Sequence, residues 1–438
     1  MFEFRKEMEC TPSQERRAEN WCTGSAICTT VGQSPFIDPG IIILYAHALG
    51  AGDMFSLAVV PIPTFFVGLF SLVATVLTAR QRYQTSILQA TLVGLVGFLV
   101  VICAPFFSFG KWVVLAGVLC YGVANVIYLT SWQPLLNSFL SEKRRCLYLG
   151  KMRFSWQLAA AIFLFIVSRL IGKNPPIWYL QLVMVAGFFA FAVRLLCISS
   201  VPTFVKGEHR KVQQFHYKEG LLLALSNKAL AGFSIYIFAL NLFACATIPL
   251  TILHLKFGLQ APANVIVLMS SISLLGQLSG SFSSGRFVSR FGTRPMLLGC
   301  HTFYVLTNLG MFFMGPGVFS DVLLYTIVAV ILYVHSFVTA CIDVTSTNEM
   351  MHLATPGNEV IAMAFCNGLN YAGRSIPTML CSLIVGAGFL APEWDLGCMH
   401  GLGYQTLFLA FAMGIFFSFV LTLMVSAIVP NRKPSTLS

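Results

Sequence analysis

Long apolar runs, separated by short polar stretches, make up most of the chain. Each run is close to the length of about 20 residues that a helix needs to cross a bilayer. A β-barrel would instead show alternating segments of about ten residues, so helices are the predicted element. The pattern predicts twelve membrane helices, near 22–48, 54–78, 84–108, 111–137, 154–172, 176–200, 228–254, 264–286, 294–315, 321–345, 358–388 and 404–429.

The longest polar stretch, 201–227, divides the predicted helices into two sets of six. Its end, about 214–226, fits either a short helix on the membrane surface or part of a solvated linker. The expected fold is therefore an all-α polytopic membrane protein built from two six-helix bundles. Its predicted parts are a cytoplasmic segment 1–21, a bundle 22–200, a linker 201–227, a bundle 228–429 and a cytoplasmic tail 430–438.

Composition narrows the class of protein further. Of the 438 residues, 57% are hydrophobic and only 10% are charged, whereas soluble proteins carry about 25% charged residues. This excludes a soluble enzyme, a nucleic-acid binder, a disordered chain and a secreted disulfide scaffold. The 13 cysteines are scattered and form no CxxC pair, so we expect neither a metal site nor a cofactor.

Lys and Arg residues indicate the orientation in the membrane. With the N-terminus placed inside, 21 of them fall in inside segments and three fall outside, at Lys111, Lys173 and Lys256. Cytoplasmic loops carry such an excess. We therefore expect both termini to be cytoplasmic, in a plasma membrane, with short loops that suit a bacterial inner membrane. The net charge of +11 comes from these loop clusters, so no nucleic-acid partner is expected.

The two halves repeat each other at matching positions. Residues 43–53 resemble 252–262, residues 78–84 resemble 288–295, and residues 140–153 fall opposite 354–367. The three offsets are nearly constant, which supports a duplicated six-helix unit. In transporters, such repeats place the substrate site at the interface between the halves, near the bilayer midplane.

The segment 285–295, "GRFVSRFGTRP", resembles a loop pattern of the major facilitator superfamily. Gly285, Arg290, Gly292 and Arg294 match that pattern, while Ser289 stands where the family usually has Asp. The copy in the first half, 77–86, keeps Arg80 and Arg82, and 141–153 is similar to the family's loop between its fourth and fifth helices. The resemblance covers about 22–430 and implies the family's fold, without indicating a substrate.

Arginines in these loops have two interpretations. At a helix end, Arg can bond the last carbonyls and offset the negative end of the dipole, or it can pair with a carboxylate and latch one conformation. The alternative is that they are only positive-inside anchors. The candidate gating residues are Arg80, Arg82, Gly285, Arg290, Gly292 and Arg294.

Ionisable residues inside membrane helices are costly and usually functional. Asp38 lies in the first predicted helix, directly before Pro39 and Gly40. A carboxylate beside a helix break is typical of a substrate or ion site, and Asp38 could carry a proton. The alternative is a hydrogen-bonded structural aspartate.

Arg374 lies in the middle of the eleventh predicted helix, with Asn370 one turn earlier on the same face. Arginine keeps its charge, so it needs an anion. That anion could be Asp38, the substrate, or each in turn. The alternative is a fixed ion pair between helices.

Further polar side chains lie on the fourth, seventh and tenth predicted helices. The resemblance implies that these helices and the first line the family's cavity. His335 and Asp343 share a face of 321–345 and could relay protons, unless Asp343 is simply solvated. Asn125, Tyr128 and Asn241 suit either an organic solute or hydrogen bonds between helices.

Two sets of residues carry no functional prediction. Gly276 and Gly280 have the spacing of close helix packing, and we expect them to bring their helix near the other half. Arg169 and Arg194 lie near predicted helix ends, where long side chains can reach the interface.

The sequence therefore predicts a monomeric secondary active transporter that moves a small organic solute by alternating access. Asp38 is the expected proton or substrate-cation site, and Arg374 the substrate-anion or gating charge. No P-loop, HExxH or GxSxG occurs, so neither ATP-driven transport nor enzymatic catalysis is expected. The alternatives are an uncoupled facilitator of the same fold and a non-transporting receptor or scaffold.

Overall fold

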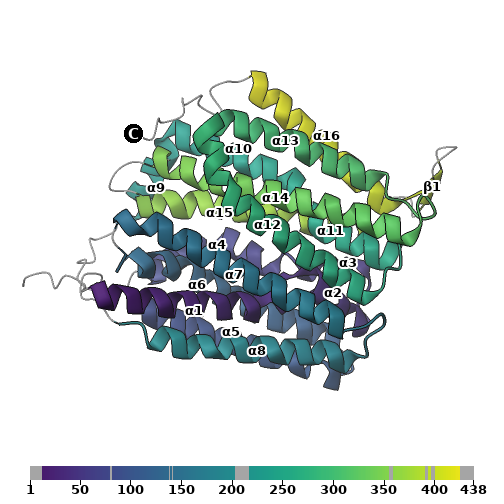
Figure 1. Cartoon of the computed structure of the whole chain (residues 1–438), viewed down its shortest axis with the longest axis horizontal. Helices are drawn as coiled ribbons and strands as arrows, with labels where there is room; N and C mark the ends of the chain where they lie inside the picture. The colour runs from purple at the N-terminus through teal and green to yellow at the C-terminus, as the bar shows by residue number, and fades with distance from the viewer. Residues whose placement is uncertain are drawn as a thin grey trace, which may run out of the picture.

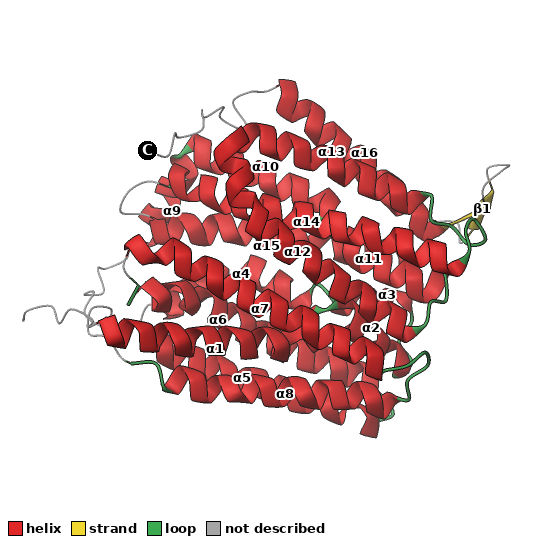
Figure 2. Cartoon of the chain, viewed as in Figure 1, coloured by secondary structure: helices red, strands yellow, loops and turns green. Residues whose placement is uncertain are grey.

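The computed structural model describes residues 12–78, 81–137, 139–140, 142–202, 217–354, 359–389, 393–395 and 400–424. Helices account for nearly all of these residues, and two short strands pair near one end (Figure 2). The helices of the first half are α1 (Pro12–Ile37), α2 (Pro39–Ala48), α3 (Asp53–Val59), α4 (Ile62–Thr78), α5 (Tyr83–Cys103), η1 (Ala104–Phe106), α6 (Gly110–Asn137), α7 (Glu142–Leu170) and α8 (Ile177–Ser199).

The second half follows a short helix, α9 (Tyr217–Ser226), which agrees with the helical interpretation of that polar stretch. Residues 214–216 lie outside the described part of the chain. The remaining elements are α10 (Lys228–Ala244), α11 (Thr247–Leu253), the π-helical turn η3 (His254–Gly258), α12 (Ala263–Phe291), α13 (Thr293–Phe312), α14 (Asp321–Leu353), α15 (Glu359–Gly386), β1 (Glu393–Asp395), β2 (His400–Leu402) and α16 (Gly403–Met424).

The helices of the two halves form two packed layers of roughly parallel rods (Figure 1). The halves meet chiefly where α4 packs on α15 and where α7 packs on α12. These two contacts occupy corresponding places in the repeat. We call the end of the bundle where α1 begins the Arg-rich end, because Arg16, Arg17 and Arg290 lie there, and the opposite end the far end.

Eight described helices are long and apolar enough to cross a membrane, and two bent pairs count as broken spans. The pair α1 and α2 bends by 45°, and the pair α3 and α4 bends by 41°. Pro39 directly follows the first break and Pro61 lies in the second, and proline lacks the N–H that a continuous helix would use. With α13 and α15 alongside, the arrangement is consistent with twelve membrane helices.

Several helices run past the predicted boundaries at the Arg-rich end. Helix α7 starts at Glu142 instead of residue 154, and α14 continues to Leu353 instead of 345. Likewise, α1 begins at Pro12, within the segment that we expected to precede the first helix. Polar residues can stay helical once they leave the apolar layer, so hydropathy underestimates helix length there.

The outer surface of the bundle is apolar. Large side chains such as Leu170, Phe189 and Val322 are exposed on helices from both halves. A soluble protein rarely exposes so many contiguous apolar groups. The chain is a multi-pass membrane protein, and these side chains face lipid.

Direct contacts between the two halves close the far end of the bundle. Tyr404 of α16 donates a hydrogen bond to the carboxylate of Asp53 on α3. The hydroxyl of Ser382 on α15 donates to the carbonyl of Met54 at 2.7 Å. We call these contacts, together with the next pair, the far-end seam.

The seam also includes the start of α12. The N–H groups of Ala263 and Asn264 donate to the carbonyls of Lys173 and Gly172, at 2.9 and 3.0 Å. The first N–H groups of a helix lack partners within the helix itself. Here the loop between α7 and α8, in the other half, supplies them. Gly172 adopts a φ of +70°, which glycine tolerates without strain.

Candidate functional site

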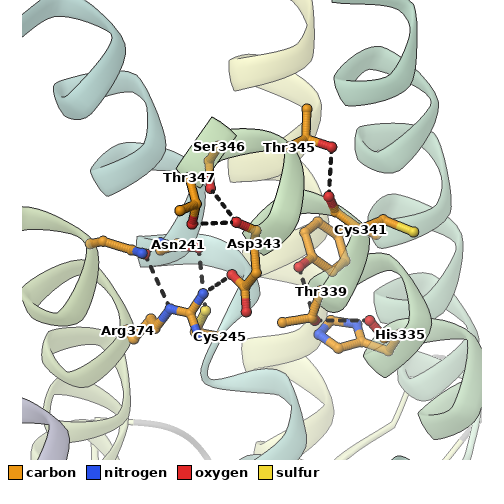
Figure 3. Close-up of polar contacts among 12 residues, drawn as sticks. Asn241, Cys245, His335, Thr339, Cys341, Asp343, Thr345, Ser346, Thr347 and Arg374 are labelled. Atoms are coloured by element: carbon orange, nitrogen blue, oxygen red, sulfur yellow. Dashed lines mark hydrogen bonds and ion pairs between the residues drawn. The ribbon is translucent and has the colours of Figure 1, made fainter. Parts of the chain in front are cut away.

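A charge pair lies in the middle of the second half. Arg374 of α15 forms an ion pair with Asp343 of α14 (Figure 3). The Nε of Arg374 also donates to Oδ1 of Asn370 at 3.1 Å, and Nδ2 of Asn241 on α10 donates to the same oxygen at 2.7 Å. Three helices therefore hold the guanidinium group in one orientation.

The pair is accessible although it lies between apolar helices. The Arg374 side chain is 23% exposed and that of Asp343 is 35% exposed. Asn367, Asn370 and Tyr371, on the same face of α15, are half-buried. Helix α15 packs on α4 of the other half, so this polar face borders the region between the halves. The arrangement can therefore present a positive group and an amide to a solute.

The surroundings of the pair are polar. Thr347 and Ser346 donate to the backbone carbonyl of Asp343, at 2.7 and 3.3 Å. The thiol of Cys245 donates to the Oδ1 of Asn241 at 3.4 Å and is half-buried (Figure 3). The site thus contains a native thiol beside the amide network.

His335 lies deeper in the same half than the charge pair. It is only 1% exposed, its Nε2 donates to the carbonyl of Ala244 at 3.1 Å, and its Nδ1 lies 3.0 Å from Oγ1 of Thr307. A carbonyl only accepts hydrogen bonds, so Nε2 carries the proton. Thr339, one turn later, accepts from the Tyr304 hydroxyl at 2.9 Å. His335 and Asp343 form no direct hydrogen bond, and the proton relay stays a prediction.

Asp38 sits at the break between α1 and α2. Its Oδ1 accepts from the N–H of Ile41 at 3.1 Å, which caps α2. A Cβ on Gly40 would lie 2.7 Å from the hydroxyl oxygen of Ser270 on α12, so this helix break lies close against the other half. The anion that Arg374 pairs with in this structure is Asp343. Asp38 was one of the partners that the sequence left open.

The remaining candidates, on the fourth and seventh predicted helices, lie in different surroundings. Asn241 belongs to the amide network beside Arg374. Asn125 is only 7% exposed, and its Nδ2 lies 3.5 Å from the carbonyl of Pro63 on α4, which fits a bond between helices. Tyr128 is 6% exposed and packs against a buried arginine.

That arginine is Arg194 of α8, which does not reach the interface as we expected. It is 1% exposed, and its Cζ lies 3.8 Å from the ring centre of Tyr128 and 5.0 Å from that of Phe191. Its Nε and Nη2 have no hydrogen-bond partner. Proximity to the helix end was the misleading signal, because α8 packs against α1 along this stretch.

Arg153 of α7 is a second residue that the sequence did not single out. It is half-buried on α7, the helix that packs on α12 of the other half. The prediction placed Arg153 in a loop, whereas α7 begins about three turns earlier. The polar spacing of Arg153 and Gln157 could have indicated an inward-facing surface.

The candidate gating residues lie at the Arg-rich end. The Nη2 of Arg294 donates to the carbonyls of Thr422 and Leu423, at 3.1 and 3.3 Å, so Arg294 bonds the end of α16. Gly292 joins α12 to α13 with a φ of +83°. Buried Glu349 of α14 reaches the start of α13, where its Oε2 accepts from Thr293 at 3.4 Å.

The other gating candidates lie at the same end. Arg290 is exposed near the end of α12, and Arg82 is exposed directly before α5. A Cβ at Gly285 would meet no atom within 4 Å. Arg80 lies outside the described residues.

Two further features bear on where a ligand could bind. A hollow of about 870 Å³ lies at the Arg-rich end between α1 and α8, lined in part by Arg16, Arg17 and Trp21. It is remote from the charge pair. Within the described ranges, no three His, Cys, Asp or Glu side chains gather closely enough to hold a metal ion.

Two packed helical halves with an accessible charge pair near their interface are typical of membrane transport proteins, and the family match assigns the chain to that class. The chain belongs to the Major Facilitator Superfamily, whose family model matches residues 23–378. No curated protein sequence matches it.

Solved transporter structures share its fold. A POT family transporter in complex with a thioalcohol-conjugated peptide superposes with a TM-score of 0.72 at 12% identity, covering 94% of this chain and 97% of that one. The xylose transporter XylE from E. coli gives 0.65 at 11%, with 95% and 98% covered. The nucleoside transporter NupG gives 0.60 at 14%, with 96% and 100% covered.

Proposed function

We propose that the protein is a secondary active transporter that moves a small organic solute by alternating access of its two halves. The observation that carries this proposal is the Arg374–Asp343 pair, which stays accessible among apolar membrane helices. Ionisable residues among membrane helices are costly and usually functional. An accessible pair, bordered by Asn370 and Asn241, suits a site that a polar solute enters.

Solute binding engages Arg374 in this proposal. A carboxylate or phosphate on the solute competes with Asp343 for the guanidinium group, which offers a planar fork of N–H donors. Asn370 and Asn241 then orient the solute through hydrogen bonds. Alternating access further requires that the solute interact differently with the inward-facing and outward-facing conformations.

Asp343 is the residue that binds the coupled proton in this proposal. When Asp343 takes up a proton it loses its attraction for Arg374, and the solute anion can replace it. We assign the proton to Asp343 rather than Asp38, since Asp343 pairs directly with Arg374 while Asp38 caps α2. His335 stands two turns away on the same helix and is the second proton carrier in this proposal.

The membrane context completes the proposal. The Arg-rich end is cytoplasmic, in agreement with the excess of Lys and Arg there, and the membrane is the plasma membrane. The far end is closed by contacts between the halves, so the conformation described here does not open to the outside. The protein acts as a monomer.

The first experiment is a thermal-shift screen of the purified full chain, at two pH values, against small metabolites. A ligand that binds only the folded state stabilises it by about 2.7 kcal/mol at a hundredfold excess over Kd. Each hit is then tested for counterflow in proteoliposomes, which is exchange of labelled for unlabelled solute. Counterflow by the wild type supports alternating access. Stabilising ligands that show no counterflow would indicate a receptor instead.

Replacement of Asp343 separates coupling from binding. In Asp343→Asn, counterflow of the solute should persist while accumulation driven by an imposed pH gradient should be lost. The amide cannot take up a proton, yet Arg374 remains available to the solute. Uptake assays with and without the gradient measure both activities.

Asp38→Asn provides the matched comparison, because it also removes one carboxylate from the membrane region. We expect it to retain gradient-driven accumulation. Loss of accumulation in Asp38→Asn alone would move the proton site to Asp38. Wild-type transport that never responds to a pH gradient would identify an uncoupled facilitator.

A further inference from the structure

The hollow at the Arg-rich end is formed within the first half, where α1 packs on α8. Its volume is about 870 Å³. One face of α1 lines it, since the lining positions recur every three or four residues along that helix. Helix α8 contributes a residue near its end. The residues used below are Arg16, Arg17, Asn20, Trp21, Gly24 and Cys197.

The lining changes from charged to small and apolar along α1. Arg16, Arg17 and Asn20 come first, nearest the Arg-rich end, and all three are exposed. Farther along, a Cβ on Gly24 would lie 3.6 Å from the Sγ of Cys197, so two small residues face each other between the helices. The hollow therefore has a basic, water-exposed mouth and a floor without charge.

The two arginines at the mouth are available to an anion. In the described part of the chain, neither Arg16 nor Arg17 forms an ion pair or a hydrogen bond. Glu15 and Glu19, the acidic residues of the same stretch, do not line the hollow and have interactions of their own. The hollow thus carries two positive charges that no lining carboxylate offsets.

The surface beside the hollow favours a lipid over a soluble anion. Leu196, the neighbour of Cys197, is 67% exposed, and Val193 and Phe189 on the same face of α8 are also exposed. An acyl chain can lie along this apolar face while its headgroup stays at the arginines. Half-buried Trp21 lies between the two levels, and tryptophan is enriched at the membrane–water interface.

We propose that the hollow binds the phosphate headgroup of an anionic phospholipid from the leaflet at the Arg-rich end. Arg16 and Arg17 hold the phosphate, because guanidinium offers a planar fork of N–H donors that matches it. Asn20 and the indole of Trp21 supply further N–H donors. Basic pockets between membrane helices bind such headgroups. The site lies in one half and does not depend on the proposed transport function.

The test measures lipid binding to the purified full chain in a neutral detergent. Phosphatidylglycerol is the anionic probe, and phosphatidylcholine with the same acyl chains is the zwitterionic one. Glycerol 3-phosphate supplies a soluble phosphate without acyl chains. Native mass spectrometry counts the bound lipids, and thermal shift gives the Kd of each probe. We expect phosphatidylglycerol to stabilise the protein and to bind at least about tenfold more tightly than the other two probes.

Substitution of the arginines connects binding to the hollow. Each basic residue near an anionic lipid contributes about fivefold in affinity, so Arg16→Gln with Arg17→Gln should weaken phosphatidylglycerol binding about thirtyfold. Arg16→Lys with Arg17→Lys, which keeps both charges, should retain most of it.

Lys151→Gln with Lys228→Gln is the matched control. It also removes two exposed positive charges from the Arg-rich side of the bundle, and neither lysine lines the hollow. This pair should bind phosphatidylglycerol as the wild type does. The melting temperature of each variant without lipid reports whether it folds.

Four results would overturn the proposal. Phosphatidylcholine binding as tightly as phosphatidylglycerol would mean that apolar contact alone holds the lipid, and equally tight glycerol 3-phosphate would indicate a site for soluble phosphate. An equal loss in the arginine and lysine pairs would assign the effect to the overall charge of this end. Wild-type affinity in Arg16→Gln with Arg17→Gln would remove the arginines from the site. Counterflow is measured separately, so failure of the lipid site leaves the transport proposal standing.

Discussion

Asp38 has a structural task that its sequence context only partly indicates. Its carboxylate accepts the N–H of Ile41 and so begins α2 after the proline break. An uncapped helix start leaves N–H groups without partners, which is costlier where water is scarce. The residue therefore holds the bend in place whether or not it ever binds a proton.

Substitutions at Asp38 should reveal this capping role. Asp38→Ala should lower the stability of the protein by about 1 kcal/mol, the usual cost of a lost helix cap. Asp38→Asn should stay close to wild type because its amide oxygen still accepts the bond. Thermal unfolding in detergent measures both variants, and equal destabilisation would show that the charge matters more than the cap.

At this scale the sequence identified some site residues and missed others for definable reasons. Arg374 and Asn370 were predictable together because one helical turn separates them. The partner of Arg374 was not, since Asp343 is distant in sequence and comes from another helix. Arg194 was dismissed because hydropathy gives depth along a helix but not which neighbours enclose the side chain.

Small residues allow helix α12 to pack closely on α14. A Cβ at Gly276 would lie 2.3 Å from the carbonyl oxygen of Tyr333 on α14, and one at Gly280 would lie 2.3 Å from that of Phe337. Ser273 and Ser336 bond at 2.6 Å between the same helices. The expectation that this stripe approaches the other half was wrong, because it packs α12 on α14 within one half.

Gly276→Ala should therefore push two backbones apart. We expect a loss of about 1–3 kcal/mol in stability, typical of overpacking at a tight contact. Gly285→Ala on the same helix is the control, since its Cβ would meet open space and alanine favours the helix. The melting temperature should fall in Gly276→Ala and should stay the same or rise in Gly285→Ala. Equal values would contradict the close contact.

Element boundaries followed hydropathy well inside the apolar layer and poorly beyond it. The start of α8 and of α12 agree with prediction within one residue, whereas α7 starts twelve residues earlier than expected, at 142 rather than 154. Charged side chains such as Lys151 and Arg153 suggested a loop, yet they can extend toward water while the backbone stays helical. Because of that error, the sequence analysis placed Arg153 in a loop and did not consider it as a helix residue.

The whole molecule is held closed at one end by the far-end seam. The Tyr404–Asp53 hydrogen bond joins a helix of each half, so it is made only when the halves approach. The Arg374–Asp343 pair, in contrast, joins two helices of the same half. Rocking of the halves therefore breaks the seam but leaves the charge pair intact.

Tyr404→Phe should shift the protein toward the conformation that is open at the far end. Loss of a hydrogen bond to a carboxylate changes the free-energy difference between the two conformations by about 1.5–3 kcal/mol, which is about ten- to hundredfold in their population ratio. Cys245, beside Asn241, is a native reporter. Its labelling by a membrane-impermeant maleimide added at the far side, followed by mass spectrometry, should increase.

Tyr333→Phe is the control for this experiment. Tyr333 bonds Ser279 at 2.8 Å within one half, so its loss should leave Cys245 labelling unchanged. An equal increase in both variants would mean that labelling reports loosening of the fold and not opening of the seam.

The start of α12 has a consequence for how that opening proceeds. Its N–H groups at Ala263 and Asn264 are satisfied by carbonyls of the other half, across the line where the halves must part. Once separated, these donors have no partner in their own helix. The halves therefore cannot part into a dry gap. Water must therefore reach the N–H groups of Ala263 and Asn264 as the seam opens, so hydration of the seam precedes full separation of the halves.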